Sequence, residues 1–107
     1  MEHQIFLYLG LSISIFFSDK TGECKGYKTV IAVIGEPPYA EGYGDRTHLN
    51  LHHTDVEMLK NVKSSKDSDR KVVLVTMTGR PLWIDEVLPS VNAAVASFLP
   101  GTEGGHG

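Results

Sequence analysis

A continuous apolar run rich in β-branched residues, TVIAVI, extends from Thr29 to Ile34. The run has no polar face, which is typical of a strand that is covered on both faces in a parallel sheet. A second run of the same type, KVVLVTM, extends from Lys71 to Met77. Parallel strands need a crossover connection, which is usually a helix. The interval between the two runs is therefore expected to hold that crossover.

The interval contains a helix signature. Thr54 followed by Glu57 fits a capping box, with Thr54 as the N-cap. Apolar residues then recur on one helical face at Val56, Leu59 and Val62. These features predict a helix over Asp55 to Val62 and a strand-loop-helix-strand unit with a right-handed parallel crossover.

The remaining elements complete an α/β fold class. Trp83 to Leu88 is predicted as a short helix, and Asn92 to Phe98 as a third buried strand, with a helix as the less favoured alternative because of its alanines. The expected architecture is a partial three-layer sandwich built on a parallel sheet. Three parallel strands with so few helices would leave sheet faces uncovered, so we expect the chain to be an incomplete domain.

The first 26 residues stay unassigned, and the predicted domain covers residues 27 to 107. The apolar run from Ile5 to Phe17 is shorter than the roughly 20 residues that a transmembrane helix needs, so no membrane association is expected. Its length suits the apolar part of a signal peptide, although no Lys or Arg precedes it. A buried strand and an incorrectly joined exon are the alternatives.

Charge and the absence of certain motifs argue against several functions. Ten Lys and Arg stand against thirteen Asp and Glu, and the formal net charge is -3, so no nucleic acid partner is expected. The single cysteine, Cys24, cannot form an internal disulfide. A small nucleotide-binding α/β domain is disfavoured because the sequence has no P-loop and no G-x-G-x-x-G after a strand.

The loop that follows the first predicted strand is the strongest candidate for a site. It reads GEPPYAEGYGDRT from Gly35 to Thr47, and it leaves the carboxyl end of a strand, where open α/β sheets bind ligands. Tyr39 and Tyr43 add aromatic rings beside Glu36 and Glu41. Rings that stack on a pyranose and acids that protonate a leaving oxygen suit a sugar substrate. The alternative is a solvated turn with a surface ion pair between Asp45 and Arg46.

This loop is accompanied by two further motifs. They are Thr78-Gly79-Arg80-Pro81 and Leu99-Pro100-Gly101-Thr102-Glu103-Gly104. In this order, the three segments resemble the second domain of glycoside hydrolase family 3, in particular its β-glucosidases and plant-type β-glucan exohydrolases. The resemblance covers Thr29 to Gly107, and the loop is its most specific part.

The resemblance implies a part of a retaining β-glycosidase. In that family an Asp from a separate (β/α)8 barrel is the nucleophile, and the second Glu of this loop is the acid and base, a role that transfers to Glu41. Tyr39 and Tyr43 are the expected substrate contacts. Glu36, which adjoins the strand end, is expected to build the loop. The other expected loop-building residues are Asp45, Arg46 and Arg80.

The partners expected from the resemblance are a β-glucoside or β-glucan substrate and the barrel domain of the same enzyme. No cofactor is implied, and an extracellular location follows if the chain behaves like the family. His48 and His52 could share a metal by spacing, but they have no third ligand in sequence, so surface histidines are expected. Because the chain holds no barrel, we expect it to be inactive alone. The alternative is a non-catalytic carbohydrate-binding or interaction module.

Overall fold

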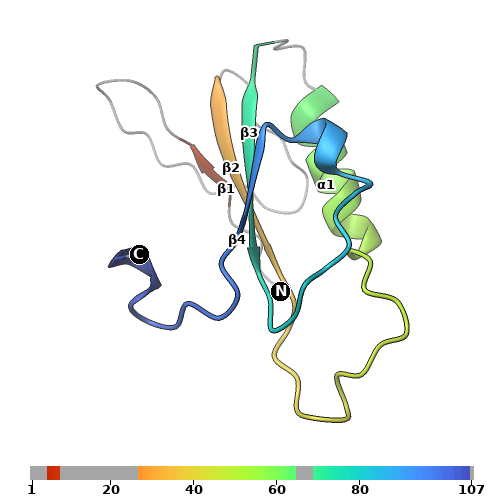
Figure 1. The fold of residues 1–107 in the computed structure, drawn as a ribbon. Coiled ribbons are helices and arrows are strands. Elements are labelled where there is room, and N and C mark those ends of the chain that lie inside the picture. Colours follow the sequence, from red (N-terminus) through yellow and green to blue (C-terminus); the bar gives the residue numbers. More distant parts are fainter. Residues whose placement is uncertain (1–4, 8–26, 65–68, 107) are drawn as a thin grey trace.

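The computed structural model describes residues 5–7, 27–64 and 69–106. Its four strands form one sheet in the order β1-β2-β3-β4 (Figure 1). Their bounds are Ile5–Leu7 for β1, Thr29–Gly35 for β2, Lys71–Met77 for β3 and Ala93–Ala96 for β4. The helix α1, His53–Ser64, connects β2 to β3, and the short 3-10 helices are η1, Leu88–Ser90, and η2, Gly104–His106.

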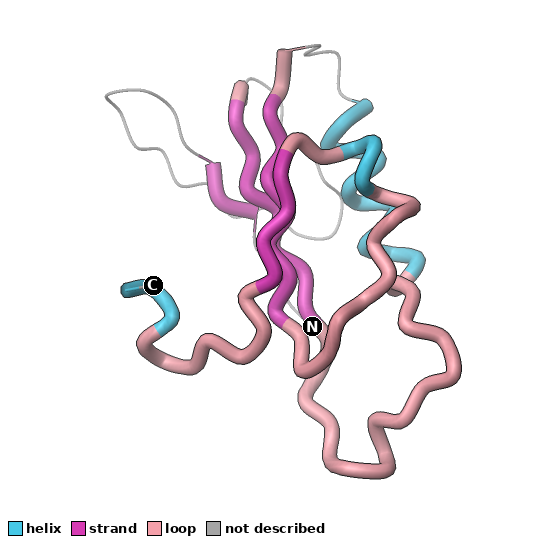
Figure 2. Tube along the Cα trace, in the orientation of Figure 1, coloured by secondary structure: helices cyan, strands magenta, loops and turns pink. Residues whose placement is uncertain are grey.

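The three strands β2, β3 and β4 run parallel, and β1 pairs with β2 in the antiparallel sense. Val30 lies opposite Val72, and Leu74 lies opposite Ala94. The predicted α/β class with a parallel sheet is therefore confirmed. Among the residues described, α1 covers one face of this sheet (Figures 1 and 2).

The core lies between α1 and the sheet. Alternate strand residues are buried because successive side chains of a strand point to opposite faces. The buried strand residues are Val30, Ala32, Ile34, Val72 and Leu74, and α1 contributes Val56, Met58, Leu59 and Val62. On the other face Ile31, Val33, Val73 and Val75 are only partly buried.

A buried cation joins the helix to the sheet. Arg70 is 2% exposed, its Nε donates to the Tyr27 carbonyl at 2.9 Å, and its Nη1 donates to the Val62 carbonyl at 2.9 Å. A cation is favourable at a helix carboxyl end, where the last carbonyls have no intrahelical partner. Arg70 thereby ties the end of α1 to the start of β2.

The start of α1 differs from the prediction. The helix begins at His53, and the His52 carbonyl accepts from Val56 N at 3.2 Å, so His52 and not Thr54 is the N-cap. Thr54 N donates to His52 Nδ1 at 3.4 Å, and Thr54 Oγ1 lies 2.8 Å from the same nitrogen. An imidazole nitrogen thus replaces the hydroxyl oxygen that the capping box assumes.

Two later predictions are also corrected. Residues 85–87 are a turn that leads into η1, so the helix predicted over Trp83 to Leu88 is wrong. Pro89 lies in η1 and has no N–H group to continue a helix. The third strand exists as β4, but its four residues are exposed because it lies at the edge of the described sheet. None of the helices in the described ranges has the length and apolar character to span a bilayer.

Candidate functional site

The loop between β2 and α1 leaves the sheet at the carboxyl end of the parallel strands (Figure 1). At its start Gly35 approaches β3 so closely that a Cβ atom there would lie 2.8 Å from the Met77 carbonyl oxygen. Glu36 N donates to the same carbonyl at 3.3 Å. The loop therefore begins beside the turn that follows β3.

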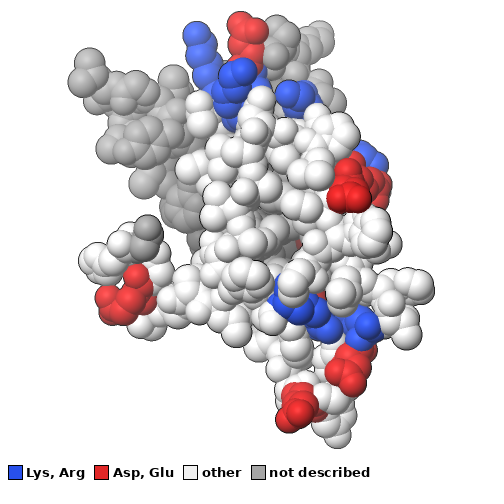
Figure 3. Space-filling model, in the orientation of Figure 1, with Lys and Arg blue, Asp and Glu red and all other residues white. Residues whose placement is uncertain are grey.

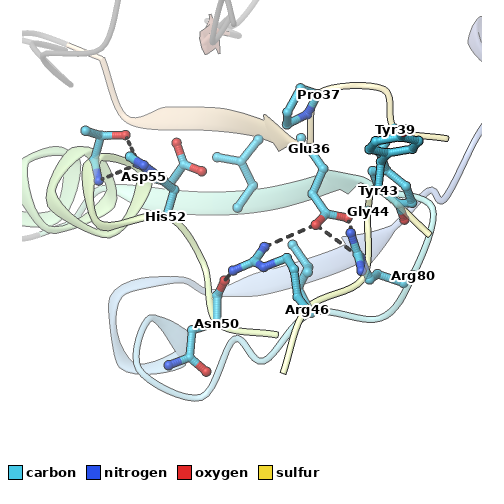
Figure 4. Close-up of a pocket in the computed structure, with 14 residues that line it drawn as sticks. Glu36, Pro37, Tyr39, Tyr43, Gly44, Arg46, Asn50, His52, Asp55 and Arg80 are labelled. Carbon is cyan, nitrogen blue, oxygen red and sulfur yellow. Dashed lines mark hydrogen bonds and ion pairs between the residues drawn. The ribbon is translucent and has the colours of Figure 1, made fainter. Parts of the chain in front are cut away.

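The Glu36 carboxylate lies between two arginines (Figure 4). Arg80 Nε is 3.2 Å from each of its oxygens, and Arg46 Nη1 is 3.2 Å from Oε1. The Glu36 side chain is only 10% exposed. Arg46 Nη2 also donates to the Asn50 carbonyl at 3.0 Å. Because hydrogen bonds between ionised groups are the strong ones, this cluster joins the loop's two ends to the turn after β3.

Tyr39 adds an aromatic contact to this cluster. The Arg80 guanidinium carbon lies 4.2 Å from the centroid of the Tyr39 ring, which is a cation–π contact. A Cβ atom at Gly79 would lie 2.6 Å from the Tyr39 hydroxyl oxygen, and one at Gly44 would overlap the ring itself. The absence of a side chain at Gly44 and Gly79 therefore lets the Tyr39 ring pack against their backbone, while one face of the ring contacts Arg80.

Glu41 lies on the turn at residues 41–44 and is not among the residues that pair with Glu36. Gly44 N donates to the Ala40 carbonyl at 3.1 Å, and Gly42 has a φ of 79°, which favours glycine. Glu41 and Asp45 are both exposed. Acidic and basic side chains lie next to one another over this end of the molecule (Figure 3). The two glutamates of the loop thus occupy opposite environments, one enclosed and one in solvent.

A cavity of about 530 Å³ opens beside the cluster (Figure 4). Its volume is within the range of about 300 to 1,000 Å³ that is usual for small-molecule sites. Glu36 lines it together with four other predicted site residues, Tyr39, Tyr43, Arg46 and Arg80. Tyr43 is 95% exposed, so its ring is open to a ligand. Glu41 and Asp45 do not line this cavity.

The cavity has polar lining residues that the sequence prediction did not include. Asn50, His52 and Asp55 contribute to its wall. Their contribution follows from the path of the loop, which returns past the cavity before α1 begins at His53. The only local signal was the alternation of polar and apolar residues in LNLHH, from Leu49 to His53.

The histidines do not form a metal centre in the described part of the chain. No group of three His, Cys, Asp or Glu side chains within these ranges is arranged to hold a metal ion. His52 is engaged with Thr54, and its ring centroid lies 4.4 Å from that of His53. The side chains that line the cavity offer carboxylate, guanidinium, amide, imidazole and aromatic groups.

The known proteins with similar sequences have the names of beta-glycosidases. The chain is 35% identical over 77 residues to the lysosomal beta glucosidase of Dictyostelium discoideum, which covers 71% of the chain and 9% of that protein. It is 38% identical over 98 residues to the probable beta-glucosidase F of Neosartorya fischeri, which covers 85% of the chain and 9% of that protein.

A third relative is the xylan 1,4-beta-xylosidase of Xylanibacter ruminicola, 28% identical over 104 residues, with 87% of the chain and 12% of that protein covered. The chain thus spans about a tenth of the length of these curated relatives. No solved structure matches it significantly. The family model described as glycosyl hydrolase family 3 C-terminal domain matches residues 14–107. The chain belongs to this family, as a part of its C-terminal domain.

Proposed function

We propose that the chain supplies the acid/base loop of a retaining enzyme that hydrolyses β-glucosides or β-glucans. Its partner in this reaction is a (β/α)8 barrel domain of the same enzyme, which contributes the carboxylate nucleophile. Membership of family 3 and the names of the relatives support the glycoside hydrolase class. Glu41 is the proposed acid and base.

The contrast between the two glutamates carries this assignment. Both oxygens of Glu36 accept from Arg80, and one also accepts from Arg46, so this carboxylate is committed to holding the loop. Glu41 is exposed on the turn. A general acid must come within hydrogen-bond reach of the departing oxygen, which an enclosed, doubly paired carboxylate cannot do. The exposed position of Glu41 favours it for this role.

The proposed reaction divides between the two domains. The barrel carboxylate attacks the anomeric carbon while Glu41 donates its proton to the departing glycosidic oxygen. Glu41 then removes a proton from water as that water attacks the glycosyl-enzyme, which restores both carboxyl groups. In retaining enzymes the two carboxyl groups stand about 5 to 5.5 Å apart. The turn that carries Glu41 is therefore proposed to face the barrel across the domain interface.

Leaving-group dependence tests the role of Glu41. In a chimera that carries residues 36–46 in a full-length family enzyme, Glu41→Ala is expected to lower kcat/KM for alkyl and oligosaccharide substrates by about 10²- to 10⁴-fold, the usual contribution of general acid catalysis. Aryl glycosides with activated leaving groups should lose much less in the glycosylation step, because their departing oxygen needs no proton.

Glu36→Ala is the matched control. It removes the anchor of the loop, so it is expected to lower kcat/KM by a similar factor for every leaving group. Equal losses on all substrates in the Glu41→Ala chimera would contradict the assignment of Glu41 as the proton donor.

A further inference from the structure

A second cavity lies next to the first and contains the only tryptophan of the chain. The cavity measures about 510 Å³. The residues of its wall that matter here are His48, Asn50, Trp83 and Glu86. Trp83 is 65% exposed. Large aromatic side chains usually bury most of their surface, so an indole that is open and beside a cavity is available to a ligand.

The backbone of Trp83 is fixed although its side chain is open. Trp83 N donates to the Leu49 carbonyl at 2.8 Å, and an isolated parallel bridge pairs Trp83 with Asn50. These bonds attach the indole to the end of the same loop that carries Glu41. With its backbone held, an indole has only two side-chain torsions to restrict when a ligand stacks on it, so little conformational entropy is lost.

The polar groups around Trp83 suit a neutral, hydroxyl-rich ligand. The Asn50 amide can both donate and accept hydrogen bonds, and so can a neutral His48 ring. The Glu86 carboxylate is paired with Lys60 Nζ at 2.9 Å, so the charge of the carboxylate is balanced. Among the described residues, neither Lys nor Arg lines this cavity. A phosphate-bearing ligand is therefore disfavoured, whereas a sugar ring can stack on the indole and hydrogen-bond to these side chains.

Asn50 connects the two cavities, because it lines both of them. Its carbonyl accepts from Arg46, and its side-chain amide points away from the Glu36 carboxylate (Figure 4). The two cavities therefore share Asn50 as a common lining residue. A ligand that extends past Asn50 would contact both of them.

We infer that Trp83, with Asn50, His48 and Glu86, forms a second carbohydrate subsite that binds a glucosyl unit of a β-linked glucan chain. The choice of ligand class rests on the proposed function, but the subsite itself needs neither Glu41 nor the barrel. It would make the enzyme favour oligosaccharides over short glucosides.

Trp83 provides its own reporter, because it is the only tryptophan in the sequence. The 107-residue chain is titrated with glucose and with β-linked glucose oligosaccharides of increasing length, and the tryptophan emission is recorded. We expect a saturable blue shift and protection from acrylamide quenching that strengthen with chain length. Asn50→Ala should raise the Kd by about 2- to 10-fold, as for one lost hydrogen bond.

A control variant separates the subsite from other causes. Phe98→Leu changes an aromatic residue that is 49% exposed and lines neither of the two cavities, so it should leave the Kd unchanged. The leaving-group dependence of Glu41→Ala tests the proposed catalytic role separately, so failure of the subsite and failure of that role are distinguishable. A folded chain that shows no change in emission with any oligosaccharide would overturn the inference.

A chimera settles the question if the chain alone unfolds too readily. It carries residues 27–106 in place of the matching segment of a full-length relative. Trp83→Ala should then lower kcat/KM for long oligosaccharides by about tenfold or more, a loss of the size that one ring stacked on an aromatic side chain contributes. The kcat/KM for an aryl glucoside should stay unchanged. An equal loss on both substrates, together with a lower Tm, would instead identify Trp83 as a contact between domains and overturn the inference.

Discussion

At the scale of single residues, Arg80 is the member of the loop cluster that contacts both Glu36 and Tyr39. Its guanidinium group reaches both oxygens of Glu36 and also covers the Tyr39 ring. The planar fork of arginine can make both contacts at once, whereas a lysine ammonium group is a point charge on a flexible chain. Arg80 is 18% exposed, so its pair with Glu36 is less screened than the pair of Arg46, whose side chain is 41% exposed.

Substitution of Arg80 should therefore cost more than substitution of Arg46. Arg80→Ala is expected to lower the free energy of unfolding by about 1 to 3 kcal/mol, since it leaves an enclosed carboxylate with one weaker partner. Arg46→Ala should cost about 1 kcal/mol or less. Urea denaturation of the two variants checks the order. A larger loss for Arg46→Ala would show that Arg46 and not Arg80 anchors Glu36.

At the scale of elements, local pattern predicts the strands well and the helix start poorly. The β-branched runs located β2 and β3 because their signal lies within each segment. The prediction of Thr54 as the N-cap is wrong because the capping box assumes a hydroxyl or carboxamide side chain, whereas here the His52 ring takes that position. In place of the helix predicted over Trp83 to Leu88, a turn at residues 85–87 leads into the 3-10 helix η1, which has Pro89 in its first turn.

The new cap assignment makes a direct prediction about α1. His52→Ala is expected to lower the free energy of unfolding by about 0.5 to 2 kcal/mol, the usual cost of a lost N-cap. His53→Ala is the matched control, because it removes the adjacent exposed ring that contacts His52 but keeps the His52 Nδ1 hydrogen bond. It should change the free energy of unfolding by less than about 0.5 kcal/mol. Equal effects in thermal or urea denaturation would argue against His52 as the cap.

At the scale of the whole molecule, the site depends on contacts that sequence spacing cannot reveal. Glu36 and Arg80 are 44 residues apart, and parallel pairing of β2 with β3 brings them together. The family resemblance indicated which segments belong to the site. It did not indicate that Asn50 and His52 line the cavity, because that depends on how the loop returns to α1.

The proposed reaction also depends on the whole enzyme and not on this chain alone. The chain spans about a tenth of its curated relatives, and the proposed reaction requires a carboxylate nucleophile from another domain. The described residues provide a loop anchored at Glu36 that carries a free carboxylate at Glu41. The central claim is that this second glutamate, and not the first, exchanges protons with the substrate.

Azide rescue in the chimera with residues 36–46 tests that claim most directly. Azide attacks the anomeric carbon of the glycosyl-enzyme and displaces the barrel carboxylate without any need for a general base. Glu41→Ala should therefore regain activity with azide on an activated aryl β-glucoside and give a β-glycosyl azide with retained configuration. Glu36→Ala should show no rescue. Rescue of Glu36→Ala together with no rescue of Glu41→Ala would contradict the account.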